Sequence, residues 1–256
     1  MVRASSVLAS PRAWAFAGLA AAVGAYYAWS ASLWNTSLWW DVAFLALVEI
    51  PAVFGLVYLA LPLRRGWGLL PLGLALILLT WLLEEAGLDA LANFGKLAAA
   101  AALAFWLLEY FESAGWVVAV ALAIPWIDAY SVWRGPTGNI IEHHPQVFTS
   151  LSFALPLPGE HDAARLGPPD LLFFALFLAA AARFDLRTRL TGIALVASLG
   201  VTIAVAVAVD SNGLPALPGL SLGFLLPNAD LLWRSLSEGR RSRRRSPSDR
   251  DGERGP

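Results

Sequence analysis

The sequence predicts an all-α polytopic membrane protein, a bundle of about eight (seven to nine) transmembrane helices. Hydrophobic residues make up 58% of the 256 residues and charged residues only 14%, whereas soluble domains are about a quarter charged. The mean hydropathy is +0.61. The apolar residues are gathered in runs of about 20, the length that crosses roughly 30 Å of hydrocarbon. A backbone in lipid must satisfy its own hydrogen bonds, so these runs are predicted to be helices.

The predicted spans follow one another with short connections, apart from one long loop. The first span follows Arg3 and Arg12 and resembles a secretion signal. Its apolar stretch is long, rich in aromatic residues and without a small-residue cleavage site, so a retained helix is predicted. The spans are predicted at 13–33, 38–62, 67–87, 91–110, 115–134, 169–184, 189–209 and 215–234.

Positive charge predicts the orientation of the bundle. With the N-terminus inside, the inner segments hold Arg64 and Arg65, the Arg183–Arg189 turn and an arginine-rich tail. This bias predicts that both termini are cytoplasmic, although the acidic turn at Glu109 and Glu112 is discordant. Almost all positive charge is arginine, with Lys96 the only lysine. That usage favours a GC-rich prokaryotic genome and hence a prokaryotic plasma membrane.

Three parts are predicted along the chain. Residues 1–12 form a cytoplasmic arm, residues 13–234 the transmembrane helical domain, and residues 235–256 a cytoplasmic tail. The tail consists of Arg, Ser, Asp, Gly and Pro with almost nothing apolar, so it is predicted to be disordered.

Composition excludes several kinds of site. The chain has no cysteine, which excludes disulfides, thiolate metal ligands and cysteine nucleophiles. A formal net charge of −1 gives no indication of a nucleic-acid partner. His143, His144 and His161 are interpreted as solvated loop residues, so neither a metal nor a cofactor is predicted.

Three acidic residues are predicted to lie within spans, namely Glu49, Asp128 and Asp170. Charged groups at such positions cost several kcal/mol and tend to mark a function. Asp128 lies twelve residues after Trp116 and Asp170 thirteen residues before Arg183, so their depths from the inner side are roughly 18 and 20 Å. Two neighbouring antiparallel helices would therefore hold two carboxyl groups at nearly the same depth.

Such a pair has a specific chemistry available to it. Two carboxyl groups a few ångströms apart cannot both ionise at low cost, so one keeps its proton. The ionised group can activate a water while the other donates to a carbonyl oxygen, and the two titrate as one unit. That would hydrolyse a peptide bond without a metal or a nucleophilic side chain. Depth alone leaves open unrelated polar residues or the ion-pathway acids of a transporter.

The sequence around these acids contains three motifs in a fixed order. Leu166-Gly-Pro-Pro-Asp170 opens an apolar stretch that ends in Arg183-Phe-Asp185, and one span later comes Gly213-Leu-Pro-Ala-Leu217. Over roughly residues 120–230 this order resembles the presenilin and signal peptide peptidase family of intramembrane aspartyl proteases. In that family an aspartate in one span is followed by a GxGD motif at the next and later by Pro-Ala-Leu.

The resemblance implies a residue for each function, in a divergent prokaryotic member. It makes Asp128 and Asp170 the catalytic pair and residues 113–234 the catalytic half, with an extracytoplasmic loop at 135–167. The substrate would be a transmembrane segment or a signal peptide, held by Gly167, Pro168, Pro169, Pro215, Ala216 and Leu217. Three features depart from the family. Ile127 stands in place of tyrosine, Pro169 in place of glycine, and five spans in place of six precede the second aspartate.

Two further hypotheses remain. The Pro169 replacement suggests a catalytically inactive relative that binds membrane helices. A small proton-coupled transporter would instead use Asp128, Asp170 and Glu49 as a relay, although the chain lacks the internal repeats typical of transporters. Within the loop, residues 147–153 are β-prone. In the resembled family the corresponding region can form a strand that pairs with an unwound substrate. The alternative for this segment is an interfacial loop that rests on lipid.

Overall fold

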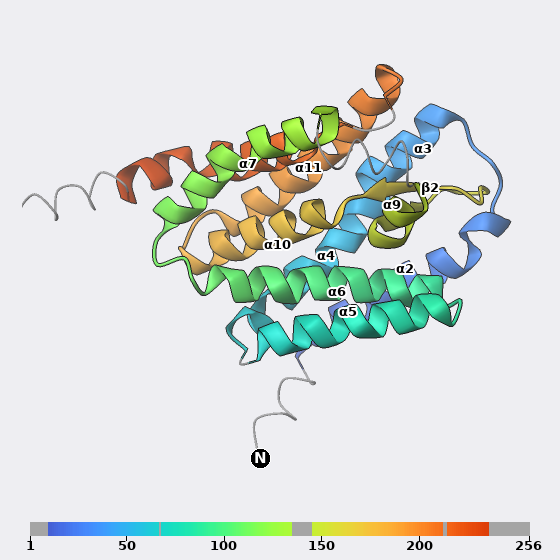
Figure 1. The fold of residues 1–256 in the computed structure, drawn as a ribbon, viewed down its shortest axis with the longest axis horizontal. Coiled ribbons are helices and arrows are strands. Elements are labelled where there is room, and N and C mark those ends of the chain that lie inside the picture. Colours follow the sequence, from blue (N-terminus) through green and yellow to red (C-terminus); the bar gives the residue numbers. More distant parts are fainter. Residues whose placement is uncertain (1–9, 67, 135–144, 212–213, 236–256) are drawn as a thin grey trace, which may run out of the picture.

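The computed structural model describes residues 10–66, 68–134, 145–211 and 214–235. These are predominantly helical, as predicted, with one two-stranded hairpin (Figure 1). A π-helical turn, Leu45–Glu49, joins α3 to α4, and short 3-10 turns end several helices. The helices are α2 (Pro11–Trp29), α3 (Leu38–Phe44), α4 (Ile50–Ala60), α5 (Leu69–Glu85), α6 (Asp89–Leu108), α7 (Ala114–Arg134), α9 (Pro145–Leu151), α10 (Pro168–Arg183), α11 (Thr188–Ala208) and α12 (Leu217–Leu225).

Membrane association is indicated by several long apolar helices, but the predicted count of eight spans is too high. In the described ranges, four segments are long and apolar enough to cross a bilayer, and each coincides with a predicted span. They are Leu38–Arg65, Asp89–Leu108, Ala114–Val132 and Thr188–Ala208. The prediction counted apolar runs, and such runs continue through turns. The helices α5, α10 and α12 have only 17, 16 and 9 residues. In α2, Arg12 and the Trp and Tyr residues lower the mean hydropathy of the helix.

The helix α10 runs through the middle of the bundle, with α5 and α6 on one side and α7 and α11 on the other (Figure 1). Every residue from Phe174 to Ala181 is at most 1% exposed. The ring of Phe174 packs on Phe54 of α4 at 3.9 Å between centroids, and Phe177 stacks on Phe224 of α12 at 5.0 Å. A helix that is apolar on all sides is one that packs inside a bundle, and α10 is that helix here.

Glycines allow several helices to approach closely, as small residues do in membrane bundles. A Cβ on Gly200 of α11 would lie 2.8 Å from the Cβ of Ala46, so no larger residue fits there without movement. A Cβ on Gly223 of α12 would lie 3.0 Å from the carbonyl oxygen of Ala194. Close helix packing at Gly200 and at Gly223 therefore depends on the absence of a side chain.

At the end of the bundle opposite the hairpin, arginines connect neighbouring segments through hydrogen bonds to backbone carbonyls (Figure 1). Arg12 donates to the carbonyl of Tyr58 at 2.8 Å, and Arg64 to that of Ala182 at 3.1 Å. Arg183 donates to the carbonyl of Leu108. The last carbonyls of a helix have no partner within it, so these guanidinium groups cap α4, α10 and α6 and bring positive charge to one end.

The hairpin pairs β1 (Phe153–Pro156) with β2 (Ala163–Leu166) in antiparallel register, Phe153 opposite Leu166. The β-prone segment 147–153, for which the sequence leaves open both a strand and an interfacial loop, lies mostly in α9 (Pro145–Leu151), and β1 begins only at its last residue, Phe153. β-Propensity alone therefore does not determine where the strand forms. The strand forms where side chains from other parts of the chain hydrogen-bond to its backbone, as at Ala154.

The turn of the hairpin packs directly on the segment after α2. Gly159 has φ +73° and donates its N–H to the carbonyl of Ser30 at 2.8 Å. A Cβ at Gly159 would lie 2.6 Å from the backbone nitrogen of Asn35 and 2.7 Å from the carbonyl carbon of Trp34. Only glycine fits, for both the backbone conformation and the space.

Replacing Gly159 by alanine is expected to destabilise the protein by roughly 2–4 kcal/mol, from left-handed strain together with a backbone clash. Gly87 is the matched control. It also has positive φ (+70°), and a Cβ there would meet nothing within 4 Å, so Gly87→Ala should cost only about 1–2 kcal/mol. Denaturant unfolding of the detergent-solubilised protein measures both, and equal losses would contradict the packing described for the turn.

Candidate active site

The side chain of Asp128 lies on the inner stripe of α7. Val117 and Ala121 on this stripe are at most 1% exposed, and helical spacing continues it through Ile124 to Asp128. The neighbouring residues Trp126, Ile127 and Tyr130 are 78, 60 and 66% exposed. Asp128 is therefore a half-buried acid on the face that α7 turns toward the bundle, while its neighbours in sequence point outward.

The side chain of Asp170 lies in the first turn of α10. Its Oδ2 accepts a hydrogen bond from the N–H of Gly167 at 3.0 Å. Pro168 and Pro169 occupy the first two helical positions, where an N–H has no partner within the helix and a fixed φ suits helix initiation. The proline that departs from the GxGD pattern is thus compatible with a regular helix start that presents Asp170.

The Pro215-Ala-Leu217 segment lies against Asp128. The N–H of Leu217, the first residue of α12, donates to Oδ2 of Asp128 at 3.0 Å. The carboxylate therefore caps a helix N-terminus, where the helix dipole also favours negative charge. Segments 89 residues apart in the sequence meet here. Each of the two acids is held in place by one backbone N–H.

Both aspartates line one cavity of about 590 Å³, and their carboxyl groups are near enough to interact electrostatically. The predicted site residues Gly167, Pro168, Pro169 and Ala216 line the same cavity. Pro215 and Leu217 are not among the lining residues, although the N–H of Leu217 donates to Asp128. The structure thus gathers most of the predicted residues around one cavity.

The other walls of the cavity were not predicted. One wall is a face of α11, whose lining residues follow helical spacing: Leu199, Thr202, Ile203 and Ala206. No sequence motif marked this face, because most of its residues are apolar like the rest of the span. The second wall is the whole of β2, Ala163–Leu166.

The strand β1 is held in place by side chains that replace a third strand. The amide of Asn93 on α6 makes two hydrogen bonds with Ala154, donating to its carbonyl at 2.8 Å and accepting from its N–H at 3.1 Å. The hydroxyls of Tyr27 and Tyr26 on α2 donate to the carbonyls of Ala154 and Pro156 at 2.8 and 2.7 Å. One edge of the hairpin is therefore satisfied by helices. The other edge, on β2, has no strand partner among the described residues and faces the cavity.

The third acid predicted to lie within a span, Glu49, is not in this site. It ends the π-helical turn, is 3% exposed, and neither carboxyl oxygen has a hydrogen-bond partner among the described residues. The nearby Tyr27 hydroxyl donates to Ala154 instead. Glu49 does not line the cavity of Asp128 and Asp170.

The described part of the chain contains no cluster of three or more His, Asp or Glu residues that could hold a metal ion. His143 and His144 lie outside the described residues, and His161 is exposed near the hairpin turn.

The Asn93 contacts can be tested by Asn93→Leu, which leaves the N–H of Ala154 without a partner. A loss of roughly 1–3 kcal/mol is expected, together with faster amide hydrogen exchange at Ala154. Tyr27→Phe removes only one of two donors to the same carbonyl, so about 1 kcal/mol and little change in that exchange are expected. Unaltered exchange at Ala154 in the Asn93 variant would show that the hairpin does not depend on this side chain.

Replacing Glu49 by methionine should raise the free energy of unfolding by about 1–3 kcal/mol, because a buried polar group without a partner is removed. The control is Glu85→Met at an exposed helix end, where a change within about 0.5 kcal/mol is expected. Thermal unfolding in detergent measures both. Destabilisation by Glu49→Met would mean that the carboxyl group makes an interaction that supports the fold.

No protein-family model, no curated protein and no solved structure matches this chain.

Proposed function

We propose that the protein is an intramembrane aspartyl protease-like enzyme, similar to the presenilin and signal peptide peptidase family. It would hydrolyse peptide bonds in transmembrane segments or signal peptides. The observation that carries the proposal is the meeting of Asp128, Asp170 and the start of α12 around one cavity. Two of the three motifs whose order suggested the family, the one ending at Asp170 and the one ending at Leu217, come together with Asp128 at this cavity although they are far apart in the sequence. The third, Arg183-Phe-Asp185, lies at the other end of α10.

The chemistry would follow from two acids in different protonation states. The ionised carboxyl takes a proton from water, and the oxygen of that water attacks the carbonyl carbon of the scissile peptide. The protonated carboxyl donates to the carbonyl oxygen, giving a gem-diol. Collapse of this intermediate breaks the C–N bond as a proton passes to the departing nitrogen. The products are a carboxyl group and an amine, and the acids return to their starting states.

The free edge of β2 would supply the contact to the substrate backbone. A helix must be unwound before its peptide bond can be cleaved, and its exposed N–H and C=O groups then need partners. Pairing with a strand edge satisfies them, and β2 presents such an edge beside Asp170. This function explains why the hairpin is fixed from its other side by Asn93, Tyr26 and Tyr27.

The other hypotheses have less support. A proton relay through Asp128, Asp170 and Glu49 would need a shared water path, and Glu49 lies outside the cavity that the aspartates line. An inactive relative was suggested by Pro169, and this proline is accommodated at the second position of α10. We therefore place activity ahead of both.

The proposed setting is a prokaryotic plasma membrane with both termini in the cytoplasm. The capping arginines at one end of the bundle support this orientation under the positive-inside rule. The hairpin would then be extracytoplasmic, and substrates would reach the cavity from within the bilayer.

The proposal is tested by reconstituting the protein in liposomes with several single-span peptide substrates and detecting products by mass spectrometry. Asp128→Asn and Asp170→Asn are each expected to lower the cleavage rate by at least about 10³-fold, because each removes one of two acid–base groups. The matched control is Asp210→Asn at the exposed end of α11, which should cleave at the wild-type rate.

The result also separates the rival functions. Absence of cleavage by the wild-type protein across all substrates, with retained binding of the peptides, would favour the inactive relative. Proton flux that depends on Asp128 and Glu49 together would favour the transporter. Cleavage that survives either asparagine substitution would exclude this pair as the catalytic residues.

A further inference from the structure

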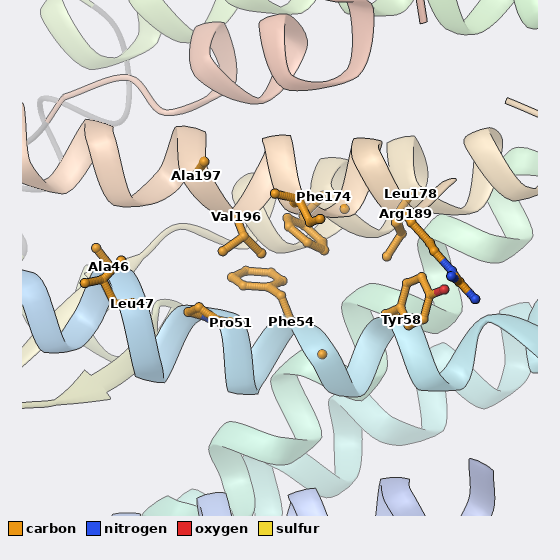
Figure 2. A pocket seen from close by; sticks show the side chains of 13 residues that line it. Ala46, Leu47, Pro51, Phe54, Tyr58, Phe174, Leu178, Arg189, Val196 and Ala197 are labelled. Atoms are coloured by element: carbon orange, nitrogen blue, oxygen red, sulfur yellow. The ribbon is translucent and has the colours of Figure 1, made fainter. Parts of the chain in front are cut away.

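A second cavity, of about 750 Å³, is an open groove between α4, α10 and α11 (Figure 2). Its floor is apolar, formed by Pro51 and Phe54 of α4 and by Phe174 and Leu178 of α10. Ile193 of α11 borders it and is 65% exposed. None of the proposed catalytic residues lines this groove.

One end of the groove is polar and positively charged. Arg189 and Tyr58 lie there together, at the end away from Ala46 and Leu47 (Figure 2). Arg189 is exposed, and no hydrogen bond or ion pair to it occurs within the described residues. The guanidinium of Arg12 stacks on the Tyr58 ring at 5.5 Å and donates only to backbone carbonyls. Two guanidinium groups therefore lie at this end, and neither forms an ion pair with an acidic residue of the described ranges.

The length of the groove fits one leaflet of a bilayer. From Ala46 to Tyr58 is twelve residues along the π-helical turn and α4, or roughly 18 Å at the helical rise. The hydrocarbon core of a bilayer is about 30 Å thick, so the groove runs from one surface to slightly beyond the midplane. Its charged end lies at the end of the bundle that the other arginines cap.

We infer that this groove binds an anionic phospholipid of the cytoplasmic leaflet, with an acyl chain along α4 and α11 and its phosphate at Arg189. A guanidinium binds a phosphate oxygen pair through parallel N–H donors. The Tyr58 hydroxyl is placed to donate as well, and Arg12 adds positive charge. Charge complementarity selects this occupant over a second copy of the chain or a partner helix, neither of which would require a phosphate-binding group at one end of an apolar groove.

Binding there would also support α10. Phe54 and Phe174 line the groove, and their ring centroids are 3.9 Å apart. Phe174 lies one helical turn after Asp170 on α10. An acyl chain in the groove would cover this buried contact between α4 and α10 from the lipid side. The lipid site itself does not depend on the proposed protease activity.

The test uses the purified full-length chain in neutral detergent, delipidated and then titrated with dioleoyl phosphatidylglycerol or dioleoyl phosphatidylcholine. Native mass spectrometry counts the bound lipids. We expect one tightly bound phosphatidylglycerol, favoured over phosphatidylcholine by about tenfold or more, because only the former carries a net negative charge.

Arg189→Gln should lower the affinity for phosphatidylglycerol by about tenfold and that for phosphatidylcholine, whose phosphate is neutralised by choline, by less. Arg65→Gln is the matched control, since Arg65 is an exposed arginine at the same end that does not line the groove. It should change neither affinity by more than about twofold.

Gly192→Leu tests the apolar part. A Cβ at Gly192 would contact Leu178 at 3.4 Å and Tyr58 at 4.0 Å, so a leucine there projects into the groove and should weaken binding of both lipids. Thermal unfolding confirms that this variant is folded. Equal binding of the two lipids by the wild-type protein would overturn the inference. So would equal effects of Arg189→Gln and Arg65→Gln, or a dimer that occupies the groove in place of lipid.

Discussion

The complete burial of α10 is the constraint on which the rest of the structure depends. Residues Phe174 to Ala181 are buried on every side, and the two aromatic residues among them each pack on a ring of another helix, while the others are leucines and alanines. Because α10 occupies the centre, the residue at its start lies inside the molecule as well. Packing of α10 therefore places Asp170 among α7, α11 and β2. At the start of a helix on the surface, the same side chain would be in water.

Helix starts provide the polar groups that an apolar interior otherwise lacks. The first N–H groups of a helix have no partner within it, and the carboxylate of Asp170 accepts from the N–H at the start of α10 as that of Asp128 does at the start of α12. At the opposite end of the bundle, the last carbonyls of the helices lack partners, and the positively charged side chains of Arg12, Arg64 and Arg183 donate to them. Acids and arginines are thus separated along the bundle by the polarity of the backbone itself.

The hairpin shows how a strand is maintained in a helical protein. A two-stranded hairpin alone is marginally stable in water, and here Asn93, Tyr26 and Tyr27 act as the missing strand on one side. The free edge is consequently the one on β2, beside the aspartates. β-Propensity at 147–153 leaves open whether this loop contains a strand. It could not locate β1, because the residues that fix this strand are about 60 and 130 positions away.

By itself, the sequence determined the helical class, four of the apolar spans, and the positions of two acids within apolar segments, because these follow from local hydrophobicity and from the cost of charge in an apolar setting. It overcounted spans, since an apolar run does not reveal where a helix starts or which helix is central. Only the tertiary structure decided that Asp128 faces inward while Ile127 does not, that Leu217 donates to Asp128, and that an apolar face of α11 completes the cavity. The physical reason is that these features depend on contacts between segments distant in sequence, which no local pattern encodes.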